Sequence, residues 1–323
     1  MHYDVFNGDA DGIIALLQLR LATPKRAQLV TGVKRDIQLL DDLAVQQGDS
    51  LTVLDISLSR NHDALLRALD AGADIFYADH HKADDIPDHA RLTAHIDLDA
   101  NVCTALIIDD LLDGRYHHWA IVGAYGDNLI AKADQLAAQV GLTKWQAEQL
   151  RELGTLINYN GYGESVDDLH FHPAELFQAL LAYDDPFALI AAQASPYHRL
   201  KSAYQQDMAQ ATALEATHID HYLAVYTLPN HAASRRISGV YGNWLANQSP
   251  EKAHVVLSEN SQQGYTVSLR APLENKQGAG ELCSQFVSGG GREAAGGINH
   301  LEKAQVPAFI KRVSEYYQIS CRG

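Results

Sequence analysis

Short apolar runs alternate with helical segments through residues 1–130, and this alternation constrains the fold more than any other feature of the sequence. Strands are expected at 3–6, 27–31, 50–57, 74–78 and 92–98, and helices at 13–20, 36–46, 61–69, 102–112 and 117–129. Strands that alternate with helices are typical of a doubly wound, mostly parallel sheet with helices on both faces. The sequence therefore predicts an α/β fold for this part of the chain.

The rest of the chain indicates a second domain. A length of 323 residues exceeds the usual size of one compact core, so two domains are expected. A break at Ser195-Pro196 ends a long helical region, and a polar helix follows. We expect a first domain with its helical connecting region at 1–195, a linker helix at 196–217 and a smaller α/β domain at 218–323.

Composition excludes several classes of protein. The chain is 46% hydrophobic and 20% charged, which is ordinary for a globular protein, and it contains neither a membrane-length apolar run nor a secretory signal. Three cysteines, Cys103, Cys283 and Cys321, form no Cys-x-x-Cys pattern, so free thiols in a cytoplasmic protein are expected. The net charge of −15 argues against a protein that coats long nucleic acids, but not against a small phosphate substrate.

Acidic residues follow the first expected strand. Asp9 and Asp11 stand two residues apart in the turn between that strand and the helix at 13–20. Two carboxylates at this place are suitable ligands for a divalent cation, whereas helix capping would explain only one of them. An EF-hand loop does not fit, because Ile13, Ile14 and Ala15 stand where further oxygen ligands are needed.

Three further segments carry acids or histidines near the ends of expected elements. Asp55 lies near the end of the strand at 50–57, Asp79-His80-His81 follows the strand at 74–78, and Asp127 follows Gly126 at the end of a helix. In a doubly wound sheet, ligands bind beyond the carboxyl ends of the strands. Because four segments supply such residues at such positions, the sequence predicts a metal site at this edge of the sheet.

A glycine-rich run marks the C-terminal domain. Gly289, Gly290 and Gly291 precede Arg292, and we expect their backbone N–H groups to form an anion-binding nest beside the guanidinium. Arg270, at the end of a strand, could be a second phosphate contact or an ordinary surface arginine. Aromatic and amide groups at 158–163 could contact a base, or a partner subunit in a homodimer, although a plain helix connection is the simpler interpretation.

The motifs together resemble the DHH phosphoesterase superfamily. Gly8-Asp9-Ala10-Asp11-Gly12, Asp55-Ile56-Ser57, Asp79-His80-His81 and Gly126-Asp127 look like its four motifs in the family's order. The run 288–296 resembles the glycine motif of the DHH-associated C-terminal domain. The layout is similar to RecJ-like exonucleases, short-oligonucleotide phosphodiesterases, and cyclic-dinucleotide and phosphoadenosine-phosphate hydrolases. Two positions depart from the pattern: Asn7 stands where the oligoribonuclease branch has histidine, and Arg292 replaces the histidine of Gly-Gly-Gly-His.

The resemblance implies a manganese-dependent phosphodiesterase with two Mn²⁺ ions, or Mg²⁺ in their place. By this analogy Asp9 and Asp11 would bind one ion each, Asp55 would bridge the ions, and His80 and Asp127 would complete the second site. Activated water would attack phosphorus in line. His81 would contact the scissile phosphate or protonate the leaving oxygen, and Asp79 would orient the histidines. The substrate would be a short oligonucleotide, a cyclic dinucleotide or a nucleotide bisphosphate.

Three alternatives remain open from the sequence. The chain could be a single-strand-specific exonuclease acting on longer DNA or RNA, although its acidic charge speaks against this. A family II inorganic pyrophosphatase shares the DHH half, but the glycine-rich arginine motif and Asn7 do not fit it well. From a different class, the chain could be a nucleotide-binding sensor that has lost catalysis.

Overall fold

The computed structural model describes residues 1–83 and 85–320, and the chain divides into two compact units, Met1–Ala203 and Tyr204–Gly323. The division falls inside helix α9 (Pro196–Thr212), within the segment expected to link the domains. Cys103 and Cys283 are buried free thiols, and Cys321 lies outside the described residues. Among the described residues, no helix is long and apolar enough to cross a membrane.

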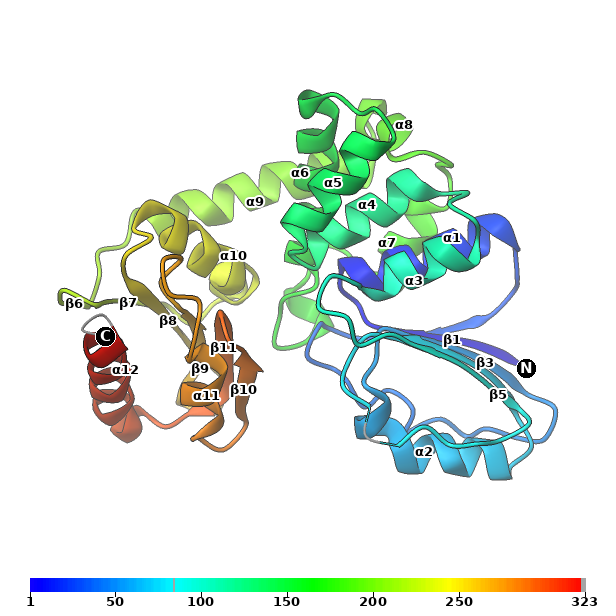
Figure 1. The fold of residues 1–323 in the computed structure, drawn as a ribbon, viewed down its shortest axis with the longest axis horizontal. Coiled ribbons are helices and arrows are strands. Elements are labelled where there is room, and N and C mark those ends of the chain that lie inside the picture. Colours follow the sequence, from blue (N-terminus) through cyan, green and yellow to red (C-terminus); the bar gives the residue numbers. More distant parts are fainter. Residues whose placement is uncertain (84, 321–323) are drawn as a thin grey trace. The chain divides into compact units, whose positions relative to one another are not determined.

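The first unit is built on a parallel sheet of five strands in the order β2-β1-β3-β4-β5 (Figure 1). Every neighbouring pair of strands is parallel, which confirms the predicted sheet. The strands are β1 (His2–Phe6), β2 (Gln28–Val30), β3 (Ser50–Leu54), β4 (Asp74–Asp79) and β5 (Leu92–Ile96).

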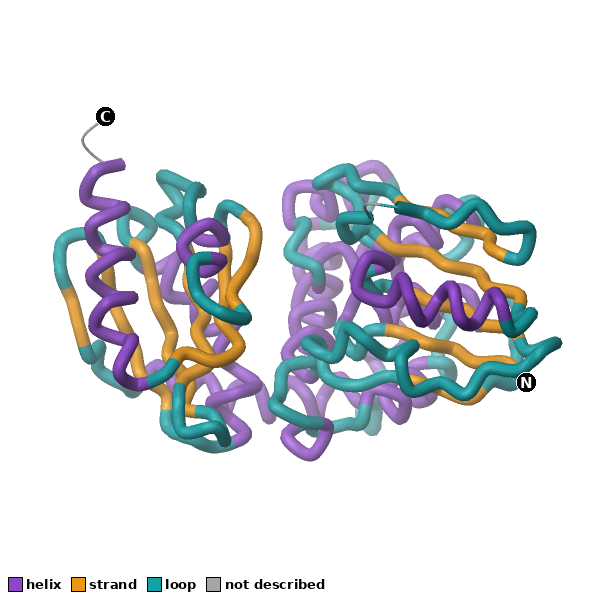
Figure 2. The backbone as a smooth tube through the Cα atoms, turned by 90° about the horizontal axis from the view of Figure 1, so that it is seen from below, coloured by secondary structure: helices purple, strands orange, loops and turns teal. Residues whose placement is uncertain are grey.

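Helices cover both faces of this sheet. Helix α2 lies on one face of the sheet (Figure 2). It places Leu58, Leu65 and Leu69 in a core with Val53 and Ile75. Helices α1 and α3 lie on the opposite face (Figure 1). The helices of this unit are α1 (Ala10–Ala22), α2 (Leu58–Asp70), α3 (Thr104–Leu111), α4 (His117–Gly126), α5 (Ile130–Gln139), α6 (Lys144–Asn160), the 3₁₀ turn η1 (Val166–Asp168), α7 (Pro173–Leu180) and α8 (Pro186–Ala191).

The helix predicted at 36–46 is wrong, because this segment contains a turn at 39–42 and otherwise irregular backbone. Asp36 accepts a hydrogen bond from the backbone N–H of Val33, which closes a tight turn. The Asn61 side chain accepts from the N–H of Leu40 and donates to the carbonyl of Ile37, so it takes backbone groups that a helix would pair internally. Tertiary contacts therefore override the local helical pattern.

The chain order reverses at β1, which lies between β2 and β3. At such a switch point the loops after neighbouring strands diverge and leave room for a ligand beyond the carboxyl ends. The loops after β1 and β3 are held to the next strand by backbone bonds, from Asn7 N–H to the Leu54 carbonyl (3.2 Å) and from Asp55 N–H to the Ala78 carbonyl (3.1 Å). The acidic residues after these strands are thereby fixed at one edge of the sheet.

The second unit contains a six-stranded mixed sheet in the order β10-β11-β9-β8-β7-β6. Buried Val255, Leu269, Leu282, Phe309 and Val313 belong to its core, and its α/β character agrees with the prediction. Strands β7 and β8 are parallel and the other neighbouring pairs are antiparallel. The elements are β6 (His218–Ile219), β7 (Leu223–Leu228), α10 (Ala232–Gln248), β8 (Ala253–Glu259), β9 (Tyr265–Arg270), α11 (Ala279–Ser284), β10 (Gly289–Arg292), β11 (Ala295–Leu301), the 3₁₀ turn η2 (Lys303–Gln305) and α12 (Val306–Ser320).

Candidate metal centre

His80, directly after β4, has a fixed orientation. Its Nδ1 atom lies 3.0 Å from the carbonyl oxygen of Val102. Because a carbonyl only accepts, Nδ1 carries the proton and donates it, which leaves Nε2 of the neutral ring with a free lone pair. The His80 side chain is 5% exposed, so this lone pair is directed into the protein. An imidazole held in this way by a carbonyl is typical of a metal ligand.

Three carboxylates surround the Nε2 atom of His80. It lies 3.5 Å from Oδ1 of Asp55, 3.8 Å from Oδ2 of Asp11 and 4.0 Å from Oδ2 of Asp127. These acids follow β3, open α1 and end α4, so separate elements converge on one point. Ligand atoms of Asp55, His80 and His81 also lie within 4.8 Å of one another. The cluster thus combines imidazole nitrogen with carboxylate oxygen around one small volume.

Helix α3 positions two of these carboxylates. Both oxygens of Asp11 accept backbone N–H groups from the start of α3, from Thr104 at 2.8 Å and from Ala105 at 2.7 Å. The Thr104 hydroxyl donates to Oδ1 of Asp55 at 3.3 Å. The N-terminus of a helix favours negative charge, so α3 stabilises the buried Asp11 carboxylate without supplying a counter-cation.

His81 is held by the acid that ends β4. Its Nδ1–H donates to Oδ1 of Asp79 at 2.7 Å, while Asp79 itself is fully buried. Burial lowers the pKa of His81, but the hydrogen bond and charge of Asp79 outweigh this effect and raise it. The His81 side chain is 40% exposed, so its Nε2 edge is open to a ligand. Asp79 and His81 therefore form an oriented acid–imidazole pair beside the His80 cluster.

The carboxylates of this cluster carry an unbalanced charge. Burial raises the pKa of Asp55 well above its ordinary value, and the charges of Asp11 and Asp9 raise it further. Burial and Asp11 also raise the pKa of Asp127, whose Oδ2 atom is buried without a hydrogen-bond partner among the described residues. The cluster offers a divalent cation such as Mn²⁺ a suitable set of ligand atoms. These are the converging carboxylate oxygens, which include the unpaired Oδ2 of Asp127, and the Nε2 atom of His80.

Asp9 differs from the other acids because a cation already pairs with it. The Lys34 ammonium donates to Oδ2 of Asp9, and Oδ1 accepts the N–H of Gly12 at the start of α1. Burial raises the pKa of Asp9, but Lys34 outweighs burial and the pKa falls to about 2. Asp9 is therefore an ionised carboxylate with an intramolecular counter-cation.

The predicted site residues of the first unit lie together. Asp55 interacts electrostatically with the four other predicted acids, Asp9, Asp11, Asp79 and Asp127. His80 and His81 also lie close to Asp55. Sequence reasoning missed Thr104, Val102 and Lys34. Lys34 follows β2 at the same edge of the sheet, so the rule that identified Asp9 and Asp55 could have found it.

The glycine-rich run forms strand β10, which pairs with β11, and the anion binding expected of it stays a prediction. Gly289 and Gly291 turn toward α11: a Cβ on Gly289 would overlap the carbonyl of Cys283, and one on Gly280 would approach the carbonyl of Gly291 at 2.5 Å. Gly290, by contrast, faces open space. The glycines therefore allow the close packing of α11 on the hairpin β10–β11.

Arg270 and Arg292 stand in one row of the second sheet. Arg292 pairs with Ala295 on β11, and Ala295 pairs with Arg270 on β9, so both arginines project from the same face. Arg292 is exposed on the edge strand. The Arg270 guanidinium donates to the Asn243 side chain at 2.5 Å and to the Gly239 carbonyl at 3.0 Å, which ties β9 to α10.

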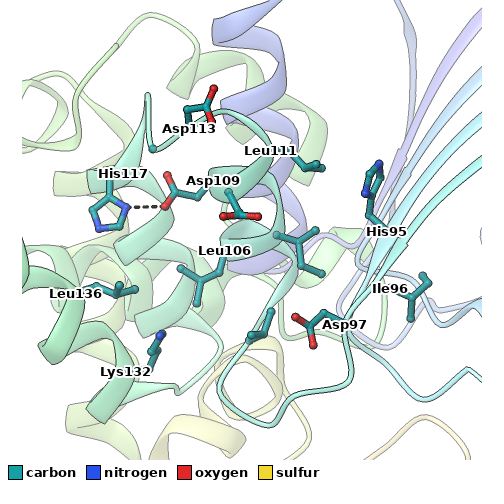
Figure 3. A pocket seen from close by; sticks show the side chains of 14 residues that line it. His95, Ile96, Asp97, Leu106, Asp109, Leu111, Asp113, His117, Lys132 and Leu136 are labelled. Carbon is teal, nitrogen blue, oxygen red and sulfur yellow. Dashed lines mark hydrogen bonds and ion pairs between the residues drawn. The ribbon is translucent and has the colours of Figure 1, made fainter.

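A separate pocket of about 700 Å³ lies between the end of β5 and helices α3 and α5 (Figure 3). Its lining includes four acids, Asp97, Asp109, Asp110 and Asp113. His117 Nδ1 lies 2.5 Å from Oδ2 of Asp109. The volume would suit a small ligand. Because these carboxylates would repel a phosphate, this pocket does not fit the expected class of substrate.

No family model matches this sequence, and the search of curated proteins finds no match. Solved structures do match. A manganese-bound RecJ exonuclease is 18% identical with a TM-score of 0.58, and the match covers 98% of this chain and 90% of that protein. RecJ of Thermus thermophilus in complex with Mn²⁺ is 17% identical with a TM-score of 0.59. This match covers 98% of the present chain and 52% of the Thermus protein, so the present chain spans about half the length of that protein.

A pGpG-specific phosphodiesterase, PggH of Vibrio cholerae, is 14% identical with a TM-score of 0.58 over 99% of both chains. An exopolyphosphatase-related protein of Bacteroides fragilis is 12% identical with a TM-score of 0.55, over 100% of this chain and 93% of that protein. At these identities the likeness concerns the fold. The chain therefore has the fold of RecJ, PggH and the exopolyphosphatase-related protein.

Proposed function

We propose that this chain is a metal-dependent phosphoesterase that hydrolyses phosphodiester bonds in short oligonucleotides or small nucleotide phosphodiesters. One observation carries the proposal: the bare Nε2 atom of His80 faces carboxylate oxygens of Asp11, Asp55 and Asp127 at 3.5–4.0 Å. A structural ion pair would not require three acids around one imidazole. The fold shared with RecJ and with a pGpG-specific phosphodiesterase supports the same interpretation.

Asp11, Asp55, His80 and Asp127 are the residues that would hold a metal ion, and Mn²⁺ suits their mixture of nitrogen and oxygen. When bound, the metal supplies Lewis-acid polarisation of a phosphoryl oxygen and activation of water. The protein fixes the ligand geometry in advance through the amide groups of α3, which bind Asp11, and through the Val102 carbonyl, which binds His80. Such preorganisation lowers the cost of reaching the transition state.

His81 would move a proton during the reaction. Its Nδ1–H bond to Asp79 fixes the ring, so a proton on Nε2 would be available to the leaving oxygen of the substrate. The half-exposed position of His81 at the border of the cluster allows contact with a substrate, which the buried His80 does not. We assign His81 as the proton donor and Asp79 as the residue that positions it.

Substrate binding in the second unit is the further part of the proposal. Arg292 is exposed on edge strand β10, beside Gly290, which faces open space. A guanidinium next to an unobstructed strand edge would suit a phosphate group, because its planar fork can donate two parallel hydrogen bonds. Arg270 would contribute less, since its guanidinium already donates to α10 and to Ser268.

A substrate panel tests this function. The purified chain would be incubated with Mn²⁺ and nucleotide bisphosphates, dinucleotides of RNA and DNA, cyclic dinucleotides, long single strands and pyrophosphate. We expect hydrolysis of the short diesters and its loss in a His80→Ala variant. Faster cleavage of long strands would indicate an exonuclease, and phosphate release from pyrophosphate alone would indicate a pyrophosphatase. Binding without hydrolysis of any of these compounds would indicate a sensor.

A further inference from the structure

The ammonium group of Lys34 lies at the metal centre and is held from three sides. Its Nζ atom donates to Oδ2 of Asp9 and, at 3.2 Å, to Oδ1 of Asn158, and it lies 5.7 Å from the ring centre of Tyr162. The Lys34 side chain is 30% exposed and that of Asp9 is 5% exposed. A surface lysine with a single partner would be mobile, but this one has a carboxylate, an amide oxygen and an aromatic face around it.

The main chain of Lys34 is fixed as well. Its N–H donates to the carbonyl of Gly161 at 2.8 Å, and its carbonyl accepts from the side chain of Asn7 at 3.2 Å. Asn7 also accepts the N–H of Asp9 through Oδ1 at 3.1 Å. The loop after β2 is thus joined to the loop after β1 and to the end of α6, and the lysine is positioned relative to Asp9 by backbone contacts.

Glycines allow the loop after β2, the loop after β1 and the end of α6 to approach one another closely. A Cβ on Gly8 would overlap the carbonyl of Gly32, and a Cβ on Gly161 would lie 3.1 Å from the Cα of Asp9 and from the carbonyl of Gly8. Larger residues would therefore separate the three loops. The segment 158–163, which the sequence singles out without a clear role, serves here to hold Lys34 against Asp9.

The partners of Asp9 and Asp11 differ in charge, and this difference decides which acid can bind a metal. The partners of Asp11 are neutral N–H groups of α3, which leave the negative charge and further lone pairs for a cation. Asp9 has one oxygen bound to the N–H of Gly12 and the other to an ammonium ion. A divalent cation at Asp9 would have to displace that ammonium or lie beside a like charge.

We propose that Lys34 takes the place of a second metal ion beside Asp9, so that this chain holds a single ion among Asp11, Asp55, His80 and Asp127. This inference rests on the proposed function and departs from the two-ion site that the motif resemblance implies. Lys34 balances the charge of Asp9 permanently, whereas a second ion would have to be taken up from solution. Lys34 also remains at the border of the site, where an ammonium could contact a phosphate oxygen.

Manganese content tests the inference without measuring turnover. The full chain and its variants would be equilibrated with Mn²⁺, freed of excess metal and analysed for metal per chain, with EPR spectroscopy to separate isolated from exchange-coupled ions. We expect one manganese ion per chain and the EPR spectrum of an isolated ion in the wild type. In Lys34→Met, which removes the charge but keeps an unbranched side chain, we expect two ions per chain. Lys25→Met, at an exposed lysine, serves as the matched control and should leave the content unchanged.

Asp9→Asn provides a second line of evidence should Lys34→Met fail to fold. Asparagine is as good an N-cap as aspartate, so α1 should remain intact. We expect Asp9→Asn to retain one ion, and the double variant Lys34→Met/Asp9→Asn to return from two ions to one. Loss of the ion in Asp9→Asn would make Asp9 a ligand and overturn the inference. So would two coupled ions in the wild type, or an unchanged content in a folded Lys34→Met.

The same measurement separates this inference from the proposed function. A wild-type chain that binds no manganese would contradict the proposed phosphoesterase itself. A wild-type chain with two coupled ions and hydrolytic activity would leave the function intact and overturn only the role of Lys34.

Discussion

The Nε2 atom of His80 lies 3.5 Å from Oδ1 of Asp55, although Asp55 follows β3 and His80 follows β4. Asp55 reaches this position with a φ of 58°, in the left-handed region that side chains rarely adopt. Its backbone N–H is meanwhile fixed to the Ala78 carbonyl at 3.1 Å. Strained backbone combined with buried like charges is typical of functional sites, because folding stability alone would favour neither.

Asp55→Asn should therefore stabilise the metal-free protein. Asparagine tolerates left-handed backbone better than most residues do, and the substitution removes a carboxyl group whose ionisation is opposed by burial and by the charges of Asp11 and Asp9. A gain of about 1 kcal/mol would raise the midpoint of thermal unfolding by roughly 2–4 °C for a unit of this size. Thermal unfolding in EDTA measures this directly.

With Mn²⁺ present, the wild type should instead have the higher midpoint of thermal unfolding. It would bind the ion more tightly than Asp55→Asn, and tighter binding to the folded state stabilises that state more. Asp63→Asn, at a carboxylate that is 91% exposed on α2, is the matched control and should change neither value. A metal-free Asp55→Asn protein that is less stable than the wild type would show that Asp55 has a purely structural role.

His81→Ala should lower kcat by roughly 10²–10⁴-fold, the usual contribution of a general acid, while the manganese content stays unchanged. Asp79→Asn should lower kcat in the same direction, because an amide no longer holds Nδ1–H of His81 as a charged acceptor does. His221→Ala, at an exposed histidine, is the control. Loss of metal in His81→Ala would instead make His81 a ligand, as its proximity to Asp55 and His80 permits.

Mn²⁺ should support faster hydrolysis than Mg²⁺, because an imidazole ligand suits the softer ion. His80→Asp replaces the Nε2 ligand by a carboxylate oxygen. The ratio of the hydrolysis rate with Mn²⁺ to that with Mg²⁺ should therefore lie closer to one in this variant than in the wild type. Initial rates at saturating metal, with both ions and both proteins, give the comparison. Equal rates with the two ions in the wild type would count against ligation by His80.

The edge of the sheet that carries the site follows from the sequence, because apolar runs mark the strands and parallel strands bring their carboxyl ends together. Asp11, Asp55 and His80 could be grouped on that basis alone, whereas Asp127 ends helix α4 and joined the group through its residue type and the motif resemblance. The same rule places Lys34 at this edge, but it does not pair the lysine with Asp9. That pairing depends on contacts of the loop after β2 with Asn7, Asn158 and Gly161, which are distant in sequence.

Two segments adopt structures that their local sequence does not indicate, and the physical reason is the same in both. Residues 36–46 have helical spacing, but the side chains of Asp36 and Asn61 capture their backbone groups. The run Gly289–Arg292 has the composition of a loop, but it pairs with β11 because α11 can pack closely only on glycine. In both segments a partner distant in sequence decides the structure, and no local pattern encodes that partner.

His254 makes the stability of the second unit depend on pH. The side chain on β8 is 2% exposed, and its Nδ1 atom has no hydrogen-bond partner among the described residues. Burial lowers the pKa of His254 from its ordinary value of 6.5 to about 4. A hydrogen bond with the Lys252 backbone and the charge of Glu251 raise this pKa, whereas the charge of the Lys252 side chain lowers it. Arg270 stands opposite in register on β9. The folded protein therefore holds His254 neutral.

Because the unfolded chain accepts this proton near pH 6.5 and the folded chain only near pH 4, the contribution of His254 is fully present above pH 6.5 and is lost as the pH falls toward 4. The full loss is on the order of 3 kcal/mol. Urea unfolding of the full chain at pH 7.5 and pH 5 measures part of it, and His254→Phe should lessen the decrease relative to the wild type. His221→Phe, at an exposed site, should unfold with the wild-type pH dependence. An identical decrease in His254→Phe and wild type would show that other groups carry the acid sensitivity.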